Sequence, residues 1–186
     1  MVRLVDTEAW MRAKLVHMIP ELSLIGDASL RQQTEDVWLE ALRRGGWTVE
    51  DLTRMPYSLS AASTSVSMLD HLRGVVGVCV AVADVFAEIY NGKIPINRDV
   101  LLAGALLHDV GKLLEYREEN GRFVRSRLGQ LLQHPVSGAV ICAELGLPDE
   151  VTHMVAVHTA PSEAGLRTPE AVILHHADFT NLETLH

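Results

Sequence analysis

The sequence predicts an all-α protein, and three observations lead to this fold class. Signals that begin and end helices recur along most of the 186 residues, whereas no stretch combines sustained period-two alternation with hairpin turns. The chain is 48% hydrophobic but only 5% aromatic, so its core must consist mainly of Leu, Val, Ile and Ala. Such a core favours packed helices, and the length suits one compact domain or a domain with an extension.

Three helices are predicted before residue 56, and each has a recognisable beginning or end. Their ranges are 7–17, 28–44 and 48–55. The first ends before Pro20, because proline cannot continue a helix. Gly45 and Gly46 end the second. Thr48 begins the third, and Asp51 completes a capping-box pattern, in which each side chain bonds to the backbone of the other residue.

A polar stretch of small residues, PYSLSAASTSVS, interrupts the helical pattern and is predicted to be a loop. We place a boundary here, between an N-terminal helical extension of residues 1–66 and a main unit of residues 67–186. The extension is expected to pack on the main unit. It could cap the helical bundle, close a pocket or form a homodimer contact.

The main unit is predicted to contain a series of helices with short connections. Their approximate ranges are 67–90, 98–107, 135–145, 148–158 and 168–179. Asn91 and Gly92 end the first, and Asn97 caps the second. Thr168 caps the last, with Pro169 at its first helical position. The segments REENGRF and TAPSEAGLR are predicted to be a charged turn and a loop.

Charge and cysteine content narrow the class of protein. The formal net charge is −8, which gives no electrostatic indication of nucleic-acid binding. Cys79 and Cys142 are isolated in apolar helical contexts, so they form neither a disulfide framework nor a zinc-binding spacing, and we expect small core residues. The N-terminus lacks a signal-peptide pattern, and no apolar run reaches the roughly 18 residues of a membrane span. These features predict a soluble cytoplasmic protein.

Histidine and aspartate side chains recur near the ends of the predicted helices of the main unit. The six candidates are His71, His108, Asp109, His134, His158 and Asp178. Any one of them alone is more often structural than a ligand. Together they indicate a divalent-metal site, because several rigid elements could aim them at one point and the doublet after LLAGALL needs partners when buried. Imidazole and carboxylate ligands without cysteine suit iron, manganese, zinc, cobalt or nickel.

Three motifs, HLRGVV, LLHDVGK and HHAD, resemble in their order the HD superfamily of metal-dependent phosphohydrolases. The signature of that family is a histidine, a His-Asp doublet and a later aspartate. These positions fall here on His71, on His108 with Asp109, and on Asp178. The resemblance covers residues 67–186 and implies an all-α HD-domain bundle with metal at its centre.

Two further positions, His134 and His158, match the additional histidines of dinuclear HD members. The stretch from 134 to 178 is similar to that of HD-type diadenosine tetraphosphate hydrolases. The end TPEAVILHHAD is similar to that of HD-type 3′–5′ exoribonucleases, although their OB-fold domain is not seen here. The GYP segment of the HD-GYP cyclic-dinucleotide phosphodiesterases is absent, which disfavours that activity.

The resemblance implies two divalent ions, Fe, Mn, Co, Ni or Zn, bridged by Asp109 in its catalytic role. The other ligands of one ion would be His71, His108 and Asp178, and those of the other His134 and His158. Water held between the ions would be acidified and would attack the phosphorus of a phosphate ester or anhydride. Lys112 would contact a phosphate oxygen at the mouth of the site. Further phosphates of a small, nucleotide-like anionic substrate could be held by Arg73, Arg125 and Arg127.

Other interpretations remain open. The same ligand set occurs in HD-type mixed-valent di-iron oxygenases, which resemble myo-inositol oxygenase, and Lys112 only mildly favours phosphate chemistry. A non-catalytic HD-like module is the third hypothesis, and retention of all six ligand types argues against it. His153 has no assigned role. On a helix, His175 shares a face with Asp178 whereas His176 diverges from it, and the sequence does not decide which of these histidines points inward.

Overall fold

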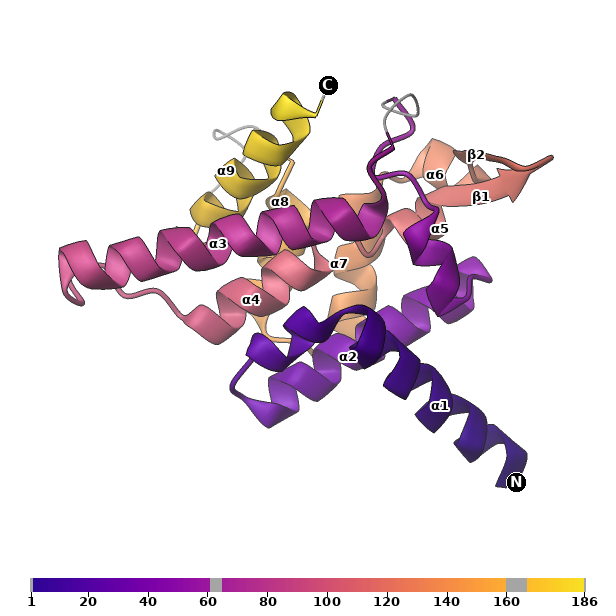
Figure 1. Ribbon diagram of the computed structural model, residues 1–186, viewed down its shortest axis with the longest axis horizontal. Coiled ribbons are helices and arrows are strands. Elements are labelled where there is room, and N and C mark those ends of the chain that lie inside the picture. Colours follow the sequence, from indigo (N-terminus) through magenta and orange to yellow (C-terminus); the bar gives the residue numbers. More distant parts are fainter. Residues whose placement is uncertain (1, 61–64, 160–166, 186) are drawn as a thin grey trace.

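The computed structural model describes residues 2–60, 65–159 and 167–185, with side chains from residue 8 onward, and confirms the all-α class (Figure 1). In chain order the elements, of which η1 and η2 are 3-10 helices, are α1 (Val2–Met18), η1 (Pro20–Leu24), α2 (Ala28–Gly45), η2 (Val49–Thr53), α3 (Met68–Tyr90), α4 (Arg98–Leu107), α5 (Lys112–Glu115), β1 (Tyr116–Glu119), β2 (Arg122–Arg125), α6 (Arg127–Leu131), α7 (His134–Glu144), α8 (Asp149–Val157) and α9 (Pro169–Thr184). Helix α1 projects from the other helices in Figure 1.

The N-terminal helices begin and end close to the predicted residues. Asp27 caps α2 by accepting hydrogen bonds from the backbone N–H groups of the second and third residues after it. Gly46 ends α2 with a positive φ of 74°. The Thr48 amide donates to the Asp51 carboxylate over 2.8 Å, as in the predicted capping box. The predicted third helix is a short 3-10 helix, and α1 begins earlier than predicted, at Val2.

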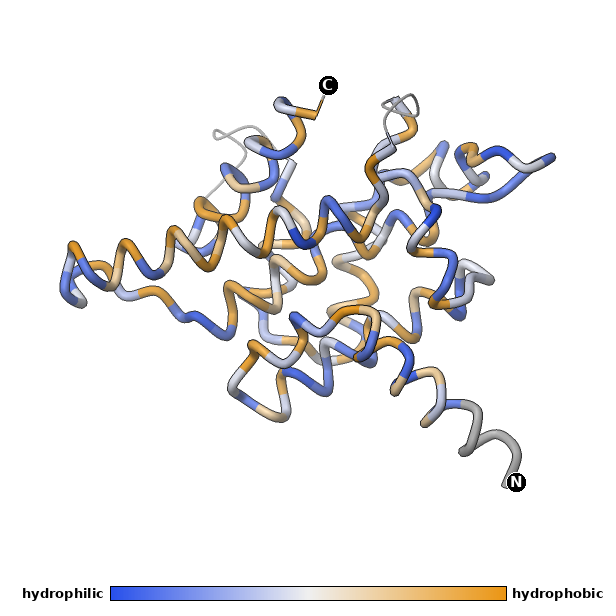
Figure 2. The backbone as a smooth tube through the Cα atoms, in the orientation of Figure 1, coloured by the Kyte–Doolittle hydropathy of each residue, from blue (hydrophilic) through white to orange (hydrophobic). Residues whose placement is uncertain are grey.

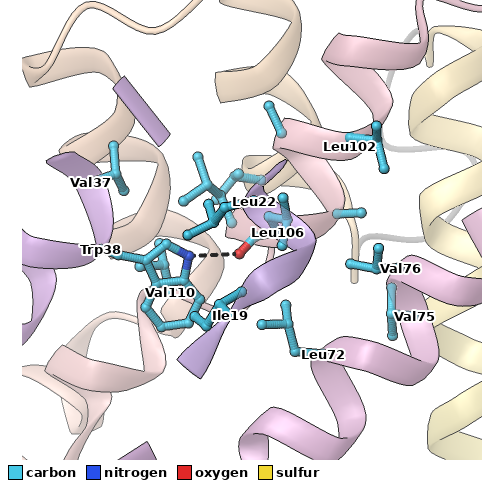
Figure 3. Packing of buried hydrophobic residues seen from close by; sticks show 14 of the residues in the cluster. Ile19, Leu22, Val37, Trp38, Leu72, Val75, Val76, Leu102, Leu106 and Val110 are labelled. Carbon is cyan, nitrogen blue, oxygen red and sulfur yellow. Dashed lines mark hydrogen bonds between the residues drawn. The ribbon is translucent and has the colours of Figure 1, made fainter. Parts of the chain in front are cut away.

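Helix α2 packs into the same hydrophobic core as the helices of the main unit. Trp38 is fully buried, and its indole N–H donates to the carbonyl oxygen of Leu106 over 3.1 Å (Figure 3). Val37, Ile19 from the segment before α2, and Val110 belong to the same buried cluster. The residues before 67 therefore share a core with α4. The division of the chain at residue 66 stays a prediction.

Helix α4 is the central element. Every residue from Val100 to Leu107 is buried, as expected for a helix that is apolar on all sides. Asn97 caps it by accepting from the amide of Val100. The long helix α3 packs against both α4 and α9, and apolar residues recur along α3 and α4 in Figure 2. The end of α4 therefore places the residues after Leu107 inside the bundle.

The predicted charged turn at 117–123 is part of a two-stranded hairpin. Strands β1 and β2 pair antiparallel, with Tyr116 opposite Arg125. Asn120 and Gly121 form the turn with φ values of 51° and 74°, the combination that a type I′ hairpin requires. The sequence interpretation missed these strands because most of their side chains are charged, so no alternation of apolar and polar residues marks them.

The last three helices complete the bundle. Helix α7 begins at His134, packs against α8, and has Pro135 in its first turn. Thr168 caps α9 by accepting from the amide of Ala171, as predicted. Of the predicted loop at 159–167, residues 160–166 lie outside the described residues, as do residues 61–64 of the loop before α3.

The structure bears on two predictions made from the sequence composition, one about the two cysteines and one about membrane-spanning helices. Cys79 and Cys142 are buried free thiols, which confirms the prediction of small core residues without a disulfide. In the part of the chain that the structure describes, no helix is both long enough and apolar enough to cross a lipid bilayer.

Candidate metal centre

Five separate parts of the fold bring the six predicted residues together. His71 comes from the first turns of α3, His108 and Asp109 from the turn after α4, His134 from the start of α7, His158 from the end of α8, and Asp178 from α9. Five of the six residues are buried, and the side chain of His134 is 17% exposed. The convergence follows from the packing of α3, α8 and α9 around α4.

Asp109 lies between two groups of ligand atoms. Its Oδ2 is 3.4 Å from Nε2 of His71 and 3.3 Å from Nε2 of His108. Its Oδ1 is 3.2 Å from Nε2 of His134 and 3.9 Å from Nε2 of His158. Each group offers three atoms within 4.8 Å of one another, which is close enough to hold one ion. One carboxylate is thus shared by two candidate positions.

Asp178 joins the first of these groups. Its Oδ1 lies 3.1 Å from Nε2 of His71 and 3.8 Å from Nε2 of His108. The first position therefore offers two carboxylates and two imidazoles, whereas the second offers the shared carboxylate and two imidazoles. The two positions are inequivalent in charge.

Three of the four candidate ligand histidines have their Nδ1 atoms facing hydrogen-bond acceptors. His108 Nδ1 lies 2.8 Å from the carbonyl oxygen of Ala105, and His158 Nδ1 lies 2.8 Å from that of Val155. His134 Nδ1 lies 2.9 Å from a carboxylate oxygen of Glu115. An acceptor at Nδ1 requires a proton there, so each neutral ring presents the lone pair of Nε2 to the centre.

The donor set fits divalent cations. Nε2 of His134 lies 3.3 Å from Nε2 of His158, and the same distance separates Nε2 of His71 from that of His108. Two lone pairs at this distance repel unless a proton or a cation lies between them. The surrounding carboxylates add negative charge, and nitrogen with oxygen donors suits iron, manganese, zinc, cobalt or nickel.

Two residues at the centre, Asp109 and His158, have the protonation states of metal ligands. Burial raises the pKa of Asp109, but the Lys112 ammonium and His108 outweigh burial and hold it well below its usual range. Burial, together with the neighbouring His108 and His134, lowers the pKa of His158 to about 3. Asp109 is therefore ionised and His158 neutral at pH 7, which are the protonation states that bind metal.

Lys112 lies deeper than the sequence suggested. Its residue is 8% exposed, and its Nζ donates over 2.6 Å both to Oδ2 of Asp109 and to the carbonyl oxygen of Tyr57. The ring of Tyr57 lies 5.3 Å from that of His71. The ammonium thus lines the centre and is held by two acceptors, while contact with a phosphate stays a prediction.

A cavity of about 280 Å³ opens from the centre to the surface. It is lined by Ser58, Leu59, Ser60, His71, Asp109, Lys112, Glu115, Tyr116, Arg125, Gln133, His134, Thr159, Asp178 and Leu182. Arg125 reaches its rim from β2, with Nε 3.5 Å from Oε1 of Glu115.

The structure does not bring the other two predicted arginines to this cavity. Arg73 donates instead to a carboxylate oxygen of Glu21 over 3.2 Å and to the carbonyl oxygen of Met18 over 2.8 Å. It follows His71 by two positions, so it lies on another face of α3. Arg127 is exposed at the start of α6 and is not among the lining residues. Substrate contact by Arg73 and Arg127 stays a prediction, and in this structure neither residue lines the cavity.

Several residues near the site had escaped the sequence interpretation. Glu115 is buried beside His134. The sequence did contain a signal, because Glu115 directly follows two leucines, and a carboxylate that is buried with them needs a hydrogen-bonding or charged partner. Tyr57 to Ser60 come from the predicted loop before α3 and carry no chemical motif. They are found only from the fold.

The three unassigned histidines have distinct positions. His175 Nδ1 lies 2.6 Å from the carbonyl oxygen of His158, so His175 supports the end of α8. His176 is exposed. His153 is half-buried on α8 and is not among the residues that line the cavity.

Comparisons with known proteins agree with this geometry. The HD domain family model matches residues 68–180. Over 113 residues the chain is 34% identical to the dihydroneopterin 2′,3′-cyclic phosphate phosphodiesterase of Methanocaldococcus jannaschii, a match that covers 60% of this chain and 44% of that relative. The chain thus spans less than half the length of this relative. A search of solved structures gave no significant match. By the extent of the family match and the order of its motifs, this chain belongs to the HD domain family.

Proposed function

We propose that this protein is a metal-dependent phosphohydrolase that hydrolyses a phosphate ester of a small anionic substrate. The observation that carries the proposal is Asp109, whose two carboxylate oxygens face two separate groups of imidazole nitrogens. Membership of the HD domain family and the phosphodiesterase activity in the name of the Methanocaldococcus relative support the same reaction class.

Two divalent ions would be held by the six convergent residues. We assign His71, His108 and Asp178 to one ion, His134 and His158 to the other, and Asp109 to both. Iron and manganese are our first candidates, followed by cobalt, nickel and zinc. When bound, such ions supply an acidified water and draw electron density from phosphoryl oxygens.

The chain's own residues would bind and orient the substrate. Arg125 at the rim would pair with a phosphoryl oxygen, and the 55% exposure of its side chain supports this role because the side chain can move toward the substrate. Lys112 offers positive charge beside Asp109, where charge builds up on the transferring group. The half-enclosed cavity limits the water that reaches the reacting phosphorus.

We further propose that the substrate is nucleotide-like and carries one phosphoryl group. Arg73 and Arg127 lie away from the cavity, so Arg125 is the guanidinium that lines it within the described residues. One guanidinium and one ammonium suit a phosphodiester or monoester better than a triphosphate. The cyclic phosphate in the relative's name makes a cyclic phosphodiester the first candidate.

The test is anaerobic purification with metal analysis, followed by a panel of substrates with and without dioxygen. The panel contains a 2′,3′-cyclic nucleotide, nucleoside monophosphates, a nucleoside triphosphate and diadenosine tetraphosphate. We expect manganese-supported hydrolysis of a single-phosphate substrate without dioxygen, and its loss in His108→Ala and Asp109→Ala. Turnover that requires iron and consumes dioxygen in proportion to product would replace this proposal with the di-iron oxygenase.

Two statements about the whole chain belong with this proposal. We propose that residues 1–66 pack on the HD bundle and complete its cavity, which is supported by the Trp38 hydrogen bond and by the lining residues Ser58 and Ser60. We also propose a cytoplasmic location, which the two free buried cysteines support.

A further inference from the structure

We infer that Glu115 is a positioning residue that holds the His134 ring with its proton on Nδ1 and its Nε2 lone pair toward Asp109. The consequence for metal binding rests on the proposed function. The orientation of His134 does not, because it is a property of the metal-free protein. Three features of the site carry the inference.

The first feature is a double hydrogen bond. Oε2 of Glu115 accepts from the backbone amide of His134 over 2.8 Å and lies 2.9 Å from its Nδ1. His134 is the first residue of α7, and the preceding Gln133 makes no side-chain capping bond. Glu115 therefore caps α7 from another helix and grips the ring of the same residue.

The second feature is the position of His134 in its helix. His108 and His158 each follow the last residue of a helix. In each, the ring Nδ1 lies within hydrogen-bond distance of the carbonyl oxygen of the residue three positions earlier. At a helix N-terminus, no preceding turn of the same helix offers such a carbonyl. Glu115 takes the place of that carbonyl, from 19 residues earlier in the chain.

The third feature is the enclosure of Glu115. The residue is 5% exposed, and Oε1 lies 3.5 Å from Nε of Arg125. Gly129 of α6 packs so closely that a Cβ there would lie 2.7 Å from Cγ of Glu115 and 2.3 Å from its carbonyl oxygen. The rotamer of Glu115 is thus fixed by packing. Such outer carboxylates fix the orientation and raise the basicity of ligating histidines.

The experiment compares Glu115→Ala and Glu115→Gln with the wild type. Glu119→Gln is the matched control, because Glu119 is an exposed carboxylate on the adjacent strand. Histidine tautomers of the metal-free protein are measured by long-range ¹⁵N–¹H NMR, with the His134 signal assigned by its loss in His134→Gln. Binding of Mn²⁺ is measured in parallel by calorimetric titration.

We expect His134 to be an Nδ1–H tautomer in the wild type and a mixture of tautomers in Glu115→Ala. The glutamine variant keeps an acceptor but loses the charge, so it should keep the tautomer. Mn²⁺ binding at one of two positions should weaken about 10–100-fold in Glu115→Ala, the usual effect of losing an outer partner. Glu115→Gln should be intermediate and Glu119→Gln unchanged.

An unchanged tautomer and unchanged Mn²⁺ affinity in folded Glu115→Ala would overturn the inference. If that variant does not fold, Glu115→Gln decides: an intermediate Mn²⁺ affinity with the tautomer kept supports the inference, and either a wild-type affinity or a changed tautomer overturns it. A wild type that binds no divalent metal would instead overturn the proposed function. The tautomer comparison would still decide the role of Glu115.

Discussion

Lys112 shows how a single buried charge can belong to a site without being free. Its ammonium bonds to Asp109 and to the carbonyl oxygen of Tyr57, and buried lysines without partners are rare. The bond to Oδ2 of Asp109 competes with any cation that binds the same oxygen. Lys112 therefore partly neutralises the negative charge of the Asp109 carboxylate, and its ammonium also contributes positive charge to the lining of the cavity.

We predict that Lys112→Met lowers kcat by on the order of a hundredfold, the usual cost of removing one electrostatic donor. Metal affinity should be equal or tighter, because the competitor for Oδ2 of Asp109 is gone. Steady-state kinetics and metal analysis of the same preparation test both parts. Lys93→Met is the control, since Lys93 is an exposed lysine in the turn after α3 and is not among the residues that line the cavity. Wild-type kcat in Lys112→Met would remove Lys112 from the proposed machinery.

Between elements, the distance from α5 to α7 sets the geometry of the second candidate position. A Cβ at Gly111 would lie 2.0 Å from the carbonyl oxygen of His134 and 2.7 Å from the amide of Gly138. Both neighbours are backbone atoms, so they cannot move without moving α7. The absence of a side chain at Gly111 thus allows His134 to approach Asp109.

We predict that Gly111→Ala destabilises the protein by about 1–3 kcal/mol, as overpacking does, and weakens metal binding at the His134 position. Gly77→Ala is the matched control, because nothing lies within 4 Å of a Cβ at this exposed position inside α3. That substitution should stabilise by about 0.5–1 kcal/mol. Urea unfolding and Mn²⁺ titration measure both effects, and similar behaviour of the two variants would contradict the role given to Gly111.

For the molecule as a whole, the candidate centre couples folding to metal binding. Its residues come from α3, the end of α4, α7, α8 and α9, so an ion would join parts of the chain that unfolding separates. Buried carboxylates such as Asp109 and Asp178 also gain a partner when a cation binds. A ligand that binds only the folded state stabilises that state by mass action.

We predict that Mn²⁺ at about 100 times its Kd raises stability by about 2.7 kcal/mol. For a chain of this size that corresponds to an increase in Tm of about 5–10 °C. Excess EDTA should reverse the increase, and Asp109→Asn should show little of it because the shared carboxylate is lost. Differential scanning calorimetry at fixed pH makes the measurement. An identical Tm with Mn²⁺ and with EDTA would argue against a metal centre in this protein.

The sequence by itself determined most of the helices, because capping and stop signals act within a few residues. Asp51, Asn97 and Thr168 bond to backbone groups three residues away, and these bonds form wherever the rest of the chain lies. The order of the HD motifs likewise identified the family before any contact was known. The hairpin at 116–125 was missed because its charged strands bury little on either face, so no periodic signal exists.

Only the tertiary structure decided which residues surround the candidate ligands. Glu115 meets His134 across 19 residues and Lys112 meets Tyr57 across 55, and neither pairing leaves a local pattern. Packing also turned Arg73 toward Glu21 while bringing Arg125 to the cavity. Local signals report hydrogen bonds within one helix. The environment of a buried side chain depends instead on which distant surfaces are buried together, and that is settled by the packing of the whole core.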